Sequence, residues 1–141
     1  MSISSAGAVN NSITENLSRY NPETIDREKY KNFIAAIQKD HRAAHKGDWQ
    51  SFLNVTISNC SKYPRFSNED LRKIVMPFLL IYGSRDPMVK DYEVAKLAEN
   101  IRDFTVQVIG EEGHFPHAVN RNCNQINRMI SEHCSRNHSA I

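Results

Sequence analysis

The sequence predicts an α/β fold in which two parallel strands are joined by a helix. Residues 78–82 form a short, continuous apolar run closed by Gly83, which is typical of a strand buried on both faces. Residues 104–109 alternate apolar and polar side chains before Gly110 and indicate a second strand. Between them, residues 91–101 carry an apolar stripe at helical spacing. Such a unit is expected to form parallel strands with a right-handed crossover.

Helices are predicted before and after this unit. Residues 27–44 place apolar side chains at the i, i+3, i+4, i+7 spacing of an amphipathic helix, which Gly47 is positioned to end. Residues 49–60 predict a second helix, with Asp48 as its N-cap. A last helix is predicted over residues 119–134.

Two segments have weaker patterns. Residues 1–22 are rich in Ser and Asn, and we expect a flexible lead-in because they bury too little surface to offset the entropy of ordering. Ser67 followed by Asp70 resembles a capping box and predicts a short helix, although the usual third residue is Glu or Gln. The chain therefore divides into a lead-in over 1–22, helices over 23–66 and an α/β part over 67–141.

Composition limits the class of protein. The 141 residues, 40% of them apolar, suffice for one small domain. A net charge of +2 argues against a nucleic-acid or acidic-membrane binder, which needs a strong basic excess. No apolar run approaches the ~20 residues of a membrane span, and the three separated cysteines are typical of reduced thiols. We expect a soluble, cytoplasmic protein without a nucleic-acid or membrane partner.

Polar loops follow both predicted strands, and each holds one residue suited to catalysis. The first loop, residues 83–87, reads G-S-R-D-P, and the second, residues 110–114, reads G-E-E-G-H. Because the carboxyl ends of neighbouring parallel strands meet at one edge of a sheet, we expect Asp86 and His114 to face each other. A carboxylate beside an imidazole fixes the tautomer of the ring and stabilises its protonated form.

The two loops and their strands resemble the last two strands of the α/β-hydrolase family. The resemblance rests on residues 74–86 (I-V-M-P-F-L-L-I-Y-G-S-R-D), on residues 106–109 and on the G-H pair that ends at His114. In that family a G-x-x-D loop supplies the acid of the catalytic triad, and a later G-H loop supplies the histidine. The resemblance implies that Asp86 is the acid and His114 the base, with no organic cofactor and no metal.

The resemblance covers only the C-terminal part of the family's fold. It is firmest from about Asp70 to Cys134, and the helices over 23–66 resemble the end of the family's cap. The family's nucleophile lies in a G-x-S-x-G elbow on an earlier strand, and no glycines of this sequence bracket a residue in that way. Ser84 is interpreted as a turn residue. The half of the fold that positions the nucleophile is thus absent from these residues.

Other histidines offer alternative sites. His117 lies near His114 but lacks the preceding glycine of the family's loop. His41 and His45 are four residues apart on a predicted helix, the spacing of two metal ligands. No third ligand has a convincing spacing, so an ordinary exposed pair is the favoured interpretation. Taken singly, Asp86 and His114 are also compatible with purely structural loop roles.

Two functions are compatible with the sequence. In the first, the chain is a truncated or split α/β-hydrolase that keeps the acid and base of the triad, is inactive alone, and acts on a small-molecule substrate once the missing half is supplied. In the second, it is a non-catalytic, α/β-hydrolase-derived binding or interaction protein. A small parallel sheet exposes its edges, so such a protein is expected to need a partner or to self-associate through an edge.

Overall fold

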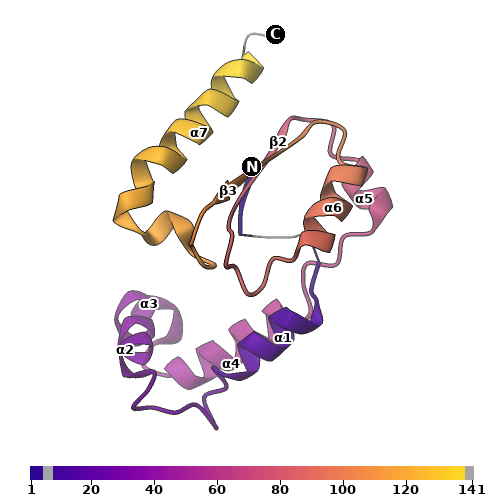
Figure 1. Cartoon of the computed structure of the whole chain (residues 1–141). Helices are drawn as coiled ribbons and strands as arrows, with labels where there is room; N and C mark the ends of the chain where they lie inside the picture. Colours follow the sequence, from indigo (N-terminus) through magenta and orange to yellow (C-terminus); the bar gives the residue numbers. More distant parts are fainter. Residues whose placement is uncertain (5–7, 139–141) are drawn as a thin grey trace. The chain divides into compact units, whose positions relative to one another are not determined.

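The structure, a computed structural model, describes residues 1–4 and 8–138 (Figure 1). The chain divides into two compact units, one made of Met1–Ala8 with Arg65–Ile141 and the other of Val9–Pro64. The first unit contains the sheet, and the second is helical. Among the described residues, no helix combines the length and the apolar character that crossing a bilayer requires.

A parallel sheet forms the centre of the first unit. Over the described residues its strands, in the order β1-β2-β3, are β1 (Ser2–Ile3), β2 (Phe78–Gly83) and β3 (Phe104–Ile109). β2 and β3 pair in parallel from Phe78 opposite Phe104 to Gly83 opposite Ile109. The expected parallel pair is confirmed, and β1 is a further strand, parallel to β2, that the sequence does not predict.

Helices cover both faces of β2. The helices of this unit are α5 (Asn68–Arg72), α6 (Asp91–Asn100), the 3-10 helix η1 (Pro116–Ala118) and α7 (Asn120–His138). Leu80 packs with Leu71 of α5 and Leu97 of α6. Leu79 and Ile81, on the opposite face, pack with Ile126 of α7. Figure 1 shows α7 on one side of the strands and α5 with α6 on the other. β2 is therefore buried on both faces, as its continuous apolar run predicts.

β3 is less well covered. Two of its valines, Val106 and Val108, have exposed fractions of 39% and 46%. They lie opposite Leu80 and Tyr82 in the register, on the face that α5 and α6 cover over β2. β3 is an edge strand of the described sheet, and one row of its side chains remains partly in solvent. This exposure agrees with the alternating apolar and polar pattern of its sequence.

The second unit contains α1 (Asn11–Ser18), α2 (Lys31–Asp40), α3 (Arg42–His45) and α4 (Trp49–Cys60). The helix predicted over 27–44 is instead two helices, because α2 begins only at Lys31 and His41 interrupts the helical backbone. The chain then passes through left-handed conformations at Lys46 and Gly47, with φ of 50° and 99°. The predicted second helix is confirmed as α4, and Asp48 caps it by accepting a hydrogen bond from the Ser51 N–H at 3.0 Å.

Part of the segment expected to form a flexible lead-in, residues 1–22, has regular secondary structure. β1 is held by parallel pairing with the buried β2, which satisfies its backbone groups on that side. α1 is capped by Asn10, whose Oδ1 accepts from the Ile13 N–H at 2.8 Å. Residues 9–22 belong to the helical unit, while residues 5–7 of the expected lead-in lie outside the described residues.

The capping box before α5 forms with Asp in place of Glu. The Ser67 hydroxyl oxygen accepts from the Asp70 N–H, and the Asp70 carboxylate accepts from the Ser67 N–H, both at 3.1 Å. Hydrogen bonds from the Ser67 side chain and then from Lys73 lower the pKa of Asp70 to about 2. The shorter side chain therefore completes the motif, and α5 begins where the sequence predicts it.

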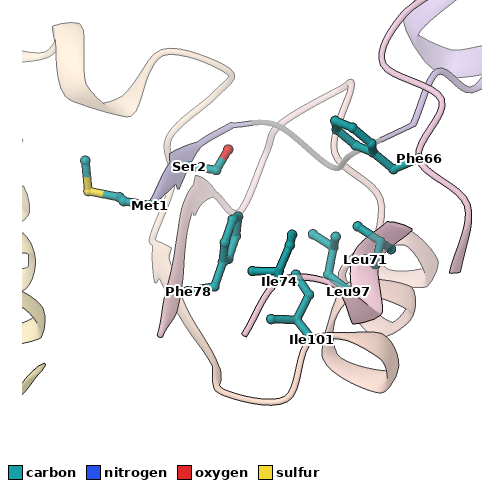
Figure 2. Close-up of a pocket in the computed structure, with 8 residues that line it drawn as sticks. All are labelled: Met1, Ser2, Phe66, Leu71, Ile74, Phe78, Leu97 and Ile101. Carbon is teal, nitrogen blue, oxygen red and sulfur yellow. The ribbon is translucent and has the colours of Figure 1, made fainter. Parts of the chain in front are cut away.

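A small, mostly apolar cavity of about 250 Å³ lies beside the core formed with α5 and α6. Its lining residues, drawn in Figure 2, are Met1, Ser2, Phe66, Leu71, Ile74, Phe78, Leu97 and Ile101. Ser2 and Phe78 are the first residues of β1 and β2, so the cavity lies at the amino ends of these strands. The polar loops singled out by the sequence follow the carboxyl ends of β2 and β3, at the opposite edge of the sheet.

Gly83 ends β2 where the backbone of the loop after β3 passes close by. A Cβ atom at this position would lie 2.2 Å from the carbonyl oxygen of Glu112 and 2.3 Å from that of Gly113.

We expect Gly83→Ala to lower the free energy of unfolding by about 1–3 kcal/mol or more, because backbone atoms would have to move. Urea denaturation measures this change. Gly110→Ala is the matched control, since its Cβ would meet nothing within 4 Å; equal losses in the two variants would contradict the prediction.

Candidate active site

The structure brings Asp86 and His114 together, as their positions after β2 and β3 predict. The Nδ1 atom of His114 lies 3.0 Å from Oδ2 and 3.1 Å from Oδ1 of Asp86. The two residues are 28 apart in the sequence, so their proximity comes from the parallel strands and not from the local chain. We call Asp86 and His114 the acid–base pair.

The loop after β2 fixes the carboxylate of Asp86. The Asp86 N–H donates to the Gly83 carbonyl at 3.0 Å and closes a turn. The N–H groups of Met88 and Val89 then donate to Asp86 Oδ1, at 2.8 and 3.1 Å. The Asp86 side chain is fully buried, with an exposed fraction of 0%. Two backbone donors and one imidazole therefore satisfy a carboxylate that water does not reach.

These contacts keep Asp86 ionised. Burial by itself raises the pKa of Asp86, but the hydrogen bonds from His114, Met88 and Val89 outweigh it and place the pKa below the ordinary value of 3.8. An ionised carboxylate only accepts hydrogen bonds, so Nδ1 of His114 carries the proton in this contact. In the neutral ring the free lone pair then belongs to Nε2.

The second ring nitrogen of His114, Nε2, has a lone pair that no described residue occupies with a hydrogen bond. None of the residues that the structure describes forms a hydrogen bond with Nε2, and the His114 side chain has an exposed fraction of 24%. Phe115 lies edge-on to the imidazole, with ring centroids 4.8 Å apart. An oriented imidazole with a free Nε2 can accept a proton from a hydroxyl group, which is the chemistry of a general base.

Backbone and hydroxyl hydrogen bonds join the two loops. The Ser84 N–H donates to the Ile109 carbonyl at 2.9 Å, and the Glu111 N–H donates to Ser84 Oγ at the same distance. The Arg85 N–H donates to the Glu112 carbonyl at 2.8 Å. Ser84 therefore serves the turn and the loop contact, in agreement with its interpretation as a turn residue.

One charged pair at the site, Glu112 with Arg121, is not predicted by the sequence. Glu112 lies in the His114 loop, yet only 8% of its side chain is exposed, and its Oε1 accepts from Arg121 Nε at 2.9 Å. Hydrogen bonds from Asn122 and then from Arg121 lower the pKa of Glu112. An acidic residue in a polar loop usually faces solvent, so nothing in the local pattern distinguishes Glu112 from Glu111.

The other candidate histidines, His41, His45 and His117, make hydrogen bonds or ring contacts within the chain. His45 donates from Nε2 to the Gln38 carbonyl at 3.1 Å and accepts the Gly47 N–H at Nδ1, so both ring nitrogens are engaged. The ring of His41 stacks on Phe52. Within residues 1–4 and 8–138, no group of three His, Cys, Asp or Glu residues is arranged to hold a metal ion. His117 is exposed and its ring contacts Phe115.

The acid–base pair makes stability depend on pH with a defined sign. The pKa of Asp86 is lower in the folded chain than in the unfolded one, so its ionised form stabilises the fold above about pH 4, and this contribution is lost as the pH falls through the folded pKa. Asp86→Asn should therefore lower the free energy of unfolding at pH 7 by about 1–3 kcal/mol, and by less at about pH 3.

Urea titrations of the Asp86→Asn variant and the unmodified chain at both pH values measure this difference. Asp103→Asn removes an exposed carboxylate of the same unit and serves as the control. A loss of stability that is the same at the two pH values would show that the charge of Asp86 is not what stabilises the loop.

Comparisons with known proteins identify the fold. No protein-family model and no curated protein matches the sequence. A variant of the meta-cleavage product hydrolase CumD is similar in structure, with a TM-score of 0.60 and 19% identity over 95% of this chain and 54% of the other. A second CumD variant, from Pseudomonas fluorescens and complexed with acetates, gives a TM-score of 0.57 and 18% identity over the same shares. The chain spans about half the length of these structures and has part of the α/β-hydrolase fold.

Proposed function

We propose that this chain supplies the acid and the base of a hydrolytic catalytic triad. The observation that carries the proposal is the contact of His114 Nδ1 with both carboxylate oxygens of Asp86, at the carboxyl ends of adjacent parallel strands. The likeness to structures with the α/β-hydrolase fold supports it. In this proposal the acid–base pair belongs to an enzyme of which the chain is a truncated or split part.

The proposed chemistry is a proton relay at His114 Nε2. The imidazole accepts the proton of a nucleophilic hydroxyl as that oxygen attacks the substrate, and the resulting imidazolium is stabilised by ionised Asp86. The same Nε2 then donates this proton to the leaving group, so the histidine ends the step neutral. Asp86 is not protonated during the cycle; it holds the ring in one tautomer and orientation.

The nucleophile of the proposed reaction comes from polypeptide other than these 141 residues. No G-x-S-x-G pattern occurs in the sequence, and Ser84 Oγ is engaged with the Glu111 N–H. Since removing the nucleophile of a triad alone lowers kcat by about 10⁶-fold, we expect the chain by itself to be inactive. The helical unit Val9–Pro64 is proposed to act as part of a cap that selects the substrate.

We propose a small-molecule substrate for the assembled enzyme. The structural neighbours are named meta-cleavage product hydrolases, so a meta-cleavage product is the first compound to test, beside p-nitrophenyl esters as general acyl substrates. The class of bond that is cleaved depends on the cap and on the missing half, because one fold supports many reactions.

The proposal is tested by restoring the missing part. We expect the coding sequence upstream of Met1 to contain a G-x-S-x-G elbow, in frame or displaced by a frameshift, and the joined protein to hydrolyse one of these substrates. His114→Ala in the joined protein should lower kcat/KM by roughly 10⁴-fold or more. His117→Ala, three residues away and exposed, is the matched control and should leave the rate unchanged. An upstream region without a nucleophile elbow, or a His114→Ala variant as active as the unmodified protein, would refute the proposal.

A second candidate function, a non-catalytic interaction protein, is favoured by the exposure of the edge strand β3. Val106 and Val108 present apolar surface beside an unpaired strand edge in the described sheet, and such edges promote association between chains. The proposed partner is a second copy of the chain.

For this candidate we expect self-association that depends on concentration in sedimentation experiments, and a shift towards the monomer in Val108→Lys. Val75→Lys is the control, because Val75 is 74% exposed and lies outside the strands. A chain that is monomeric at every concentration, or an equal effect of the two lysine variants, would argue against association through β3.

A further inference from the structure

Glu112 has a buried carboxylate, whereas the carboxylate of its neighbour Glu111 in the same loop is exposed to solvent. The residue has an exposed fraction of 6%, whereas the side chain of Glu111 is 70% exposed. Both form ion pairs with arginine, Glu111 with Arg85 and Glu112 with Arg121. Burial of a carboxylate is costly unless its oxygens are paired, so the inward orientation of Glu112 requires specific partners.

The partners of Glu112 come from the start of α7. Arg121 donates to Oε1 from Nε at 2.9 Å and also from Nη2. Asn122, next to Arg121, donates from Nδ2 to the Pro116 carbonyl at 3.1 Å. α7 is itself fixed on the sheet through Ile126. The carboxylate thus attaches the loop to a helix that packs on the strands.

The backbone of the same residue is attached to the loop of the acid. The Glu112 carbonyl accepts the Arg85 N–H at 2.8 Å, next to Asp86. It also lies against Gly83, whose lack of a side chain permits the approach. Glu112 therefore connects the Asp86 loop, the His114 loop and α7, and it precedes His114 by only two residues.

We infer that Glu112, through its ion pair with Arg121, is a positioning residue that holds His114 against Asp86. The inference rests on the proposed role of the acid–base pair, but it concerns the geometry of that pair and is measured without turnover. Without the ion pair, the His114 loop would lose its side-chain attachment to α7 and would keep only its contacts to the Asp86 loop. The bond between Nδ1 and the carboxylate would then open more often.

The test observes the Nδ1 proton of His114 directly. In the 141-residue chain, with ¹⁵N-labelled histidine, we expect a downfield Nδ1–H resonance that is absent from His114→Gln. Arg121→Ala is the first test variant, because 70% of the Arg121 side chain is exposed and its removal leaves the core intact. We expect the exchange of this proton with solvent to accelerate by at least about tenfold, as local opening becomes more frequent.

Three further variants separate positioning from general stability. Glu112→Gln keeps an oxygen that accepts from Arg121, so its Nδ1 proton should exchange more slowly than that of Glu112→Leu, which has no such oxygen. Glu111→Gln removes the neighbouring exposed ion pair and should leave the resonance unchanged. Urea denaturation of each variant reports global stability alongside the exchange rate.

The outcomes are distinct. Faster exchange in folded Arg121→Ala, together with unchanged exchange in Glu111→Gln, supports the inference. Unchanged exchange in folded Arg121→Ala overturns it, and so does global unfolding of both Arg121→Ala and Glu112→Gln, because the pair would then stabilise the fold and not the loop. If the joined protein described above fails to hydrolyse while the exchange rates change as expected, the proposed function fails and the positioning role of Glu112 stands.

Discussion

The parallel pairing of β2 with β3 determines where every residue of the candidate site lies. The strands are six residues each and pair from Phe78–Phe104 to Gly83–Ile109, so the loops that follow them start level with one another. Asp86 lies three residues beyond the end of one strand and His114 five beyond the other. A shift of the register by one residue would turn each side chain of a strand to the opposite face of the sheet. It would also separate the loops, since Gly83 would no longer lie opposite the end of β3.

The site contains two buried carboxylates that are neutralised in different ways. Asp86 accepts from two backbone N–H groups and an imidazole, a set of donors that leaves the ring partly exposed and able to exchange a proton. Glu112 accepts from a guanidinium, which stays charged at any working pH. The first arrangement suits a reaction, and the second suits a fixed structural contact. Asp86 contacts His114, and Glu112 of the same loop contacts α7, so the conformation of the His114 loop is determined by both contacts.

The sequence predicts what depends on local pattern and on general rules of topology. β2, β3 and the meeting of Asp86 with His114 follow from apolar runs, glycines at strand ends and the convergence of parallel strands. β1 has only two residues, too few for any periodicity, and exists because it docks on β2. The break at His41 and the inward turn of Glu112 depend on tertiary contacts. The Glu112–Arg121 pair joins two side chains nine residues apart across a loop and a helix start, a spacing that no local motif describes.

The point at which the helical unit leaves and rejoins the sheet unit has an evolutionary consequence. Ala8 and Arg65, which flank the Val9–Pro64 segment, form an antiparallel bridge. The exit and the return of the chain are therefore side by side, as at the base of a hairpin. A segment with such closely spaced ends can lengthen, shorten or be replaced by an unrelated one without a change in the strands that hold the acid–base pair. The insert can thus vary in length and sequence while Asp86 and His114 stay in place.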